Sequence, residues 1–77
     1  MSLHITLKLF ATLRPYAPEQ ADRYAIAPGT TVGDVVRELN IPAKDAKLIF
    51  INNIRKELDT PLQDGDRLGI FPPVGGG

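Results

Sequence analysis

The sequence Arg67-Leu68-Gly69-Ile70-Phe71-Pro72-Pro73-Val74-Gly75-Gly76-Gly77 joins a predicted strand directly to a glycine tail. Residues 67–71 are expected to form the last strand, and the two prolines after it restrict the backbone where the tail begins. The glycines have no side chains, so they offer only backbone chemistry and a C-terminal carboxylate on Gly77. Composition alone favours a frayed end, because chain termini are commonly disordered. The residues before the tail reverse this interpretation.

Length and composition predict one small domain without a nucleic-acid or membrane partner. The chain has 77 residues and no cysteine, which excludes disulfides and thiolate metal sites. Nine basic and nine acidic residues give a formal net charge of zero, which argues against binding to a phosphate backbone. No apolar run reaches the length of a membrane span, and residues 1–4 show no secretory signal. We therefore expect a cytoplasmic protein.

The first part of the chain predicts two strands. Residues 3–10 alternate between apolar and polar side chains, as a half-buried strand does. Residues 11–14 are expected to form one helical turn that closes before Pro15. Residues 23–27 form a second predicted strand, which ends at a Pro-Gly turn pair. The two strands can pair as a wide hairpin.

Residues 31–40 predict the main helix. Its apolar residues fall at positions i, i+3, i+4 and i+7 and form a single stripe: Val32, Val35, Val36 and Leu39. Thr31 and Asp34 have the spacing of a capping box, and Pro42 is expected to stop the helix. Gly33 weakens a helix, although its missing side chain permits close packing.

The second part of the chain predicts three more strand segments. The apolar run 48–51 suits a central strand covered on both faces, and an Asn52-Asn53 turn leads to a short edge strand at 54–56. Asp64-Gly65-Asp66 forms a turn before the last strand. The resulting order predicts an α+β fold in which one helix covers one face of a mixed sheet of four to five strands.

This order, together with three stretches of sequence, resembles the ubiquitin-like β-grasp sulfur carriers of the MoaD/ThiS type, most of all the small subunit of molybdopterin synthase. The stretches are Lys8-Leu9-Phe10-Ala11-Thr12-Leu13-Arg14, Pro61-Leu62-Gln63-Asp64-Gly65-Asp66-Arg67-Leu68 and Phe71-Pro72-Pro73-Val74-Gly75-Gly76-Gly77. The resemblance covers essentially the whole chain. It implies a β-grasp domain at residues 1–71 and a flexible carrier tail at residues 72–77, with Gly76-Gly77 as the terminal pair.

The resemblance also implies a function for Gly77. An adenylating enzyme of the E1-like MoeB/ThiF type would use ATP to activate its carboxylate, and a sulfur donor protein would then supply the sulfur of a thiocarboxylate. A large synthase subunit of the MoaE type would consume that sulfur in molybdopterin synthesis. The chain would be a carrier and co-substrate rather than an enzyme, with no cofactor or metal of its own.

Docking on these partners requires a surface, for which Phe71, Phe10 and Arg67 are candidates. Both phenylalanines can instead belong to the core, and Arg67, like Arg14 and Lys8, can be an ordinary solvated charge. His4 is expected at the surface, and Asp64-Gly65-Asp66 as a plain turn rather than a cation loop.

Three alternatives to the molybdopterin role remain open. They are a carrier for thiamin or another sulfur-transfer pathway, a ubiquitin-like protein modifier, and an interaction domain with an inert tail.

Overall fold

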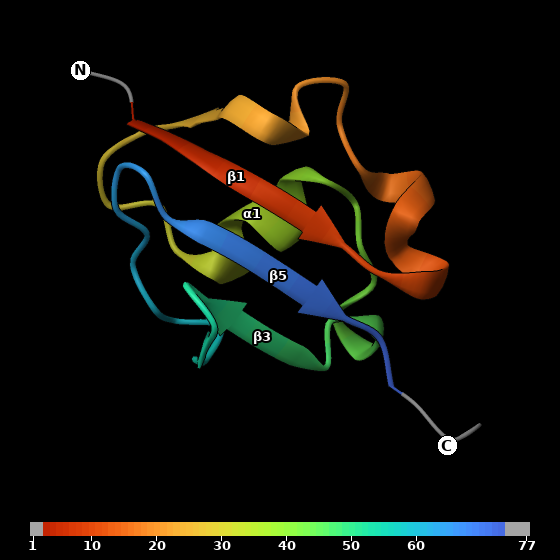
Figure 1. Ribbon diagram of the computed structural model, residues 1–77. Helices are drawn as coiled ribbons and strands as arrows, with labels where there is room; N and C mark the ends of the chain where they lie inside the picture. The colour runs from red at the N-terminus through yellow and green to blue at the C-terminus, as the bar shows by residue number, and fades with distance from the viewer. Residues whose placement is uncertain (1–2, 74–77) are drawn as a thin grey trace.

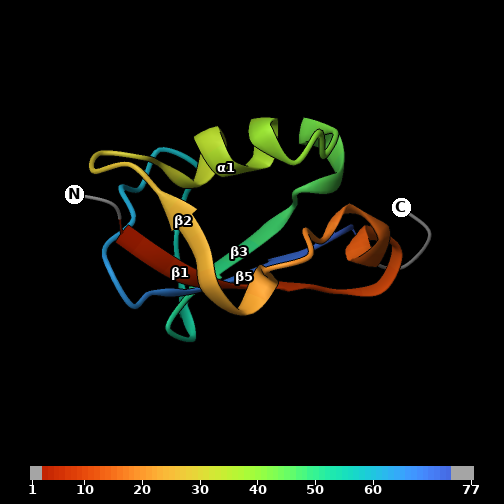
Figure 2. The same ribbon diagram turned by 90° about the horizontal axis from the view of Figure 1, so that it is seen from above.

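Five strands form one mixed sheet in the order β2-β1-β5-β3-β4, and the helix α1 lies against one face of it (Figures 1 and 2). The computed structural model describes residues 3–73, so the predictions for Val74, Gly75, Gly76 and Gly77 lie outside the described residues. The elements are β1 Leu3–Leu9, β2 Tyr24–Ile26, α1 Val32–Glu38, β3 Leu48–Ile51, β4 Ile54–Arg55 and β5 Arg67–Phe71, with 3₁₀ turns at η1 Ala11–Tyr16, η2 Ala21–Arg23 and η3 Ala43–Asp45. The predicted α+β arrangement is confirmed.

The centre of the sheet is the parallel pair of β1 and β5, in which Leu7 is opposite Leu68. Residues 48–51 form an inner strand of the sheet, but the prediction that this strand is covered on both faces was wrong. β3 lies between β5 and the short edge strand β4, and its residues alternate between half-buried and buried. The reason is that Leu48 and Phe50 point to the face opposite α1, so the apolar run is not covered on both faces.

The core fills the space between α1 and the sheet. The predicted apolar stripe of the helix is buried except for Leu39, which is half-buried. The buried apolar side chains are Ile5, Leu7, Leu9, Leu13, Ile26, Val32, Val35, Val36, Ile41, Ala46, Ile49, Ile51, Leu62, Leu68 and Ile70. Full burial of one such aliphatic side chain contributes about 1.5–3 kcal/mol, so this face supplies most of the stability.

The N-terminus of α1 is fixed by the predicted capping box. The Thr31 hydroxyl accepts from the Asp34 N–H at 3.2 Å, and the Asp34 carboxylate accepts from the Thr31 N–H at 3.0 Å. The Gly33 N–H donates to the Leu58 carbonyl at 2.7 Å, and a Cβ at Gly33 would lie 3.3 Å from that oxygen. Gly33 therefore permits the close packing of the Leu58 loop on the helix.

The helix ends at Glu38, before the predicted Asn40 and well before Pro42. Asn40 has a φ of 61°, a left-handed conformation that asparagine tolerates and that terminates helices. Tyr24 on β2 donates to a Glu38 carboxylate oxygen at 2.6 Å and so joins the edge strand to the helix. Burial and this hydrogen bond raise the pKa of Tyr24 to about 12.

The turns of the chain lie at the residues predicted for them, with one exception. Asn52 and Asn53 both have positive φ, and Gly65 turns the chain before β5 with a φ of +86°. The helical turn predicted at 11–14 instead extends through Pro15 to Tyr16. The Ala17 N–H donates to the Arg14 carbonyl at 3.0 Å and closes a turn in which Pro15 is the second residue. That position needs no backbone N–H, so the turn tolerates a proline.

Candidate functional site

The tail leaves the fold from β5, the central strand. The backbone of that strand is held on both sides at its exit: the Phe10 N–H donates to the Ile70 carbonyl at 3.3 Å, and the Lys47 N–H donates to the Phe71 carbonyl at 3.1 Å. Pro72 is buried and Pro73 is exposed. The starting point of the tail is therefore fixed by the sheet, although the division of the chain between residues 71 and 72 stays a prediction.

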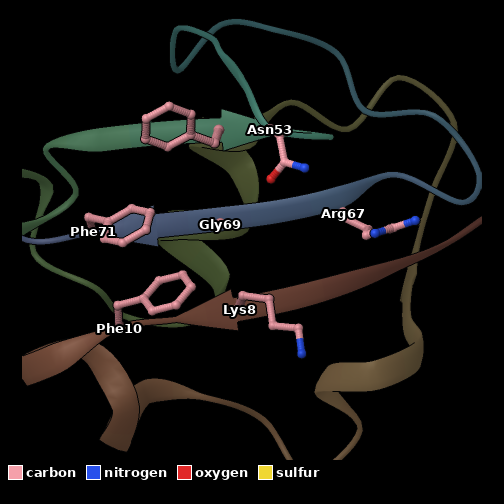
Figure 3. Close-up of a pocket in the computed structure, with 7 residues that line it drawn as sticks. Lys8, Phe10, Asn53, Arg67, Gly69 and Phe71 are labelled. Carbon is pink, nitrogen blue, oxygen red and sulfur yellow. The ribbon is translucent and has the colours of Figure 1, made fainter.

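All three phenylalanines of the chain line one groove on the open face of the sheet, which is the face opposite α1. Figure 3 labels two of them, Phe10 and Phe71. The Phe10 and Phe71 rings stack with centroids 4.1 Å apart and an angle of 2° between their planes. The Phe50 ring meets Phe71 edge-on at a centroid distance of 5.6 Å. The three rings are half-buried, so they form an aromatic cluster beside the tail exit that is neither core nor fully exposed.

Sequence reasoning identified Phe10 and Phe71 but missed Phe50. A strand covered on both faces, as predicted for residues 48–51, gives Phe50 no role at the surface. The feature that identifies Phe50 is the register of β3 on β5, which places Phe50 opposite Gly69. Cross-strand partners share a face of the sheet, so Phe50 lies on the same face as Gly69.

Gly69 forms the floor of a groove of ≈ 540 Å³ on the open face. Phe10 and Phe71 lie at one end of the groove, and Lys8, Arg67 and Asn53 lie at the other (Figure 3). Phe50 lines the groove as well and contacts Phe71. A Cβ at Gly69 would lie 3.6 Å from Phe10 Cε2 and 3.9 Å from Phe71 Cε1, both ordinary contact distances. The missing side chain thus leaves the space between the rings and the cations empty.

Arg67 and Lys8 are exposed, and neither forms an ion pair within residues 3–73. Arg67 is held in place through its backbone, because its N–H donates to Asn52 Oδ1 at 3.0 Å and its carbonyl accepts from the Asn52 N–H at 2.9 Å. Among residues 3–73, no acidic residue lines the groove. Arg14 lies on η1 and does not line the groove.

The residues considered for metal binding serve as turn partners instead. Asp64 Oδ1 accepts from the His4 N–H at 2.9 Å, and the Asp66 carboxylate accepts from the Gln63 N–H at 2.8 Å and from Asn52 Nδ2 at 3.1 Å. Residues 3–73 contain no group of three or more His, Cys, Asp or Glu that could hold a metal ion. No helix in this part of the chain is long and apolar enough to cross a membrane.

The fold and the tail exit define a ubiquitin-like β-grasp protein, and the comparisons agree. The ThiS family model matches residues 7–77, so the chain belongs to the ThiS family of ubiquitin-like sulfur carriers and modifiers. Such small carriers are non-catalytic subunits.

Two curated relatives and one solved structure illustrate the family. The chain is 28% identical to small archaeal modifier protein 3 of Haloferax volcanii, over 97% of this chain and 100% of that protein. It is 35% identical to the molybdopterin synthase sulfur carrier subunit of Escherichia coli, over 84% of this chain and 63% of that protein. The crystal structure of H. volcanii small archaeal modifier protein 1 has a TM-score of 0.73 at 27% identity, over 94% of this chain and 99% of that one.

Proposed function

We propose that this chain is the sulfur carrier of molybdopterin biosynthesis and that the carboxylate of Gly77 is the group that carries sulfur. The observation that supports this most directly is the exit of the tail from the central strand through Phe71-Pro72-Pro73, beside a half-buried aromatic cluster. The likeness to the E. coli sulfur carrier subunit supports the choice of pathway.

The tail residues suit a reactive end that must enter a partner's pocket. Glycine adopts conformations closed to other residues and keeps the tail thin. Pro72 and Pro73 fix φ near the fold and so lower the entropy cost of ordering the tail. Six residues beyond Phe71 extend roughly 20 Å at about 3.3 Å each, which is enough to cross the wall of a pocket.

The chemistry requires two external proteins, since a carboxylate at neutral pH is a poor electrophile. An E1-like enzyme of the MoeB/ThiF type binds ATP, the Gly77 carboxylate attacks its α-phosphorus, and pyrophosphate leaves. Sulfide released by a donor protein then attacks the acyl carbon and AMP leaves, which yields the thiocarboxylate without a change of oxidation state. The large synthase subunit, of the MoaE type, uses this soft nucleophile on the pterin precursor. This chain contributes the carried group and binds no cofactor itself.

Intact mass spectrometry tests the proposal. After incubation with the adenylating enzyme, ATP and a sulfur donor, we expect the mass gain of one oxygen-to-sulfur exchange. Loaded protein should then support pterin dithiolene formation by the large subunit. A variant that lacks Gly76-Gly77 is the matched control, expected to keep the fold and lose both reactions. A wild-type chain that gains no sulfur under conditions that load another carrier would refute the proposal.

A second candidate function is protein modification through an isopeptide bond from Gly77 to lysine. The full-length match to small archaeal modifier protein 3 favours it. Trypsin cleaves after Arg67, the last basic residue, so tryptic digests of cell extracts should then contain lysines that carry residues 68–77. These remnants should vanish when Gly76-Gly77 is deleted.

A further inference from the structure

We infer that Lys47 is an acylation site of this chain. Its side-chain amine attacks the acyl carbon of Gly77 when that carbon is activated and no partner holds the tail extended. The product is an amide between Lys47 Nζ and the Gly77 carbonyl carbon, which joins residues 47 and 77 into a ring. The inference rests on the proposed function for the activation of Gly77, and it assigns a nucleophile that competes with sulfur for the activated carbon.

The sheet fixes Lys47 beside the start of the tail. The Lys47 N–H donates to the Phe71 carbonyl at 3.1 Å, where the start of β3 lies next to the end of β5 (Figure 1). Leu48 is opposite Phe71 in this antiparallel pair, so the same register continued by one residue places Lys47 opposite Pro72. The side chain of Lys47 is exposed. A primary amine therefore stands at the point where the tail leaves the fold.

The residue before Lys47 keeps this placement firm. Ala46 is buried, with 6% of its surface exposed, and its N–H donates to the Ala43 carbonyl at 3.2 Å. The backbone at Lys47 is thus held by the core on one side and by β5 on the other. Movement toward the tail is left to the lysine side chain, which has a flexible four-carbon stem.

The length of the tail decides when the amine reaches the acyl carbon. Six residues beyond Phe71, fully extended, place that carbon roughly 20 Å from the end of β5, far beyond a lysine side chain. A flexible chain of six residues has a root-mean-square length of only roughly 13 Å, and opposed residues of paired strands lie about 5 Å apart. An effective concentration is highest when the chain length matches the span. A partner that holds the tail extended therefore protects the activated carbon, and release exposes it to Lys47.

The reaction balances without an oxidant or a reductant. The lone pair of the neutral amine attacks the carbonyl carbon of the acyl-adenylate, the C–O bond to AMP breaks, and AMP leaves with that electron pair while the amine proton passes to water. Relative to the free acid, the chain has lost one molecule of water. An amide has no free carboxylate to activate, so the ring ends the use of that copy as a carrier.

The other lysines of the chain are less well placed. Lys8 is opposite Gly69, two residues before the end of β5, so the tail would have to reverse its direction to reach it. The Lys56 N–H donates to the Ile49 carbonyl on the side of β3 away from β5, which puts two strand spacings, about 10 Å, between them. Lys44 lies on η3, outside the paired strands. We therefore expect acylation to select the lysine at the tail exit.

A C-terminal thioester tests the inference without any enzyme. The full chain with a thioester on Gly77, prepared through an intein fusion, carries an activated acyl group and is incubated at alkaline pH. Intact mass spectrometry should show a product lighter than the free acid by one water, in a yield independent of protein concentration. Tryptic digestion should release residues 45–55 joined to residues 68–77, because trypsin does not cleave after an acylated lysine.

Two arginine variants identify the nucleophile. Lys47→Arg keeps the positive charge and removes the amine, and we expect its ring yield to fall about tenfold or more, with hydrolysis to the free acid instead. Lys56→Arg is the matched control and should keep the wild-type yield. Unfolding in urea separates the strands, so the preference for Lys47 over the other lysines should disappear there.

The outcomes separate this inference from the proposed function. If the wild-type thioester gives only the free acid, if Lys47→Arg forms as much ring as wild type, or if the joined peptides are spread evenly over the lysines, the inference is wrong. A preference for Lys47 that persists in urea would show that the sheet does not place it. If the ring forms but the adenylating enzyme never adds sulfur to the free acid, the proposed function fails while the placement of Lys47 stands.

Discussion

The two faces of the sheet are built from the same strands but differ in side-chain type and in burial. The face under α1 carries Leu68 and Ile70, each with 0% of its surface exposed, between other buried aliphatic side chains. The open face carries the intervening residues, Arg67, Gly69 and Phe71, which alternate charge, empty space and a half-buried ring. Burial on one face stabilises the fold, whereas the half-buried rings of the other face leave part of their apolar surface uncovered.

The largest expected effect comes from the buried face. Leu68→Ala removes a fully buried side chain from the central strand and should destabilise the domain by about 2–5 kcal/mol. The neighbouring Arg67→Ala, on the opposite face, should change stability by about 0.5 kcal/mol or less. Urea unfolding followed by circular dichroism measures both. Similar losses for the two variants would contradict the division between the faces.

A smaller loss of stability and a larger loss of function are expected from the aromatic cluster. Phe71→Ala deletes one stacked and one edge-on ring contact, and should cost about 1–2 kcal/mol because the ring is only half-buried. Sulfur loading by the adenylating enzyme should fall more than tenfold while the protein stays folded. Phe71→Leu, which keeps much of the apolar volume, should lie between. If Phe71→Ala lowers the free energy of unfolding as much as Leu68→Ala does, the aromatic cluster serves to stabilise the fold.

The sequence predicted the buried face better than the open one. Alternation in residues 3–10 and the helical stripe of Val32, Val35 and Val36 report burial directly, because periodicity follows from strand and helix geometry. The choice of β5 as the central strand depends on pairing between residues far apart in sequence, and no local pattern contains it. The sequence therefore predicted no strand order, and it predicted wrongly that β3 is covered on both faces.

The same limit applies to the site. Phe10 and Phe71 could be proposed because they flank recognisable segments, whereas Phe50 joins them only through the register of β3 on β5. Nothing in the sequence distinguishes Gly69, because a glycine within a strand looks the same in the sequence whether or not it lies in a groove. The role of the tail stays a prediction, since residues 74–77 lie outside the described part of the chain.

A third test concerns how the open face holds Phe10 in place. Ala11, directly after Phe10, has a φ of 54°, a left-handed conformation that costs an alanine roughly 1–2 kcal/mol. Ala11→Gly removes that strain but raises the conformational entropy of the unfolded chain. We therefore expect the free energy of unfolding to rise by about 0.5–1 kcal/mol. Thr12→Gly is the matched control and should lower stability. If the ring contacts alone hold Phe10, Ala11→Gly keeps normal sulfur loading, and a loss of loading would show that the strained link positions the ring.

The smallest expected effect belongs to the helix that covers the buried face. The Thr31 backbone N–H, the Thr31 hydroxyl and the neighbouring Arg37 hold the pKa of Asp34 below its ordinary value. The folded pKa lies below the unfolded one, so the contribution of Asp34 is fully present above the unfolded pKa and is lost as pH falls through the folded pKa. Asp34→Asn should therefore destabilise the domain at neutral pH, and the difference from wild type should shrink on acidification.

Salt separates the two possible sources of that pH dependence. The hydrogen bond from the Thr31 backbone is the larger cause of the lowered pKa, and it is short-range, whereas attraction between exposed Asp34 and Arg37 is screened. Urea unfolding of wild type and Asp34→Asn across the acidic range, at low and high salt, should therefore give nearly the same pH profile. A profile that flattens at high salt would assign the effect to Arg37 instead, and the capping box would then matter through its geometry rather than through its charge.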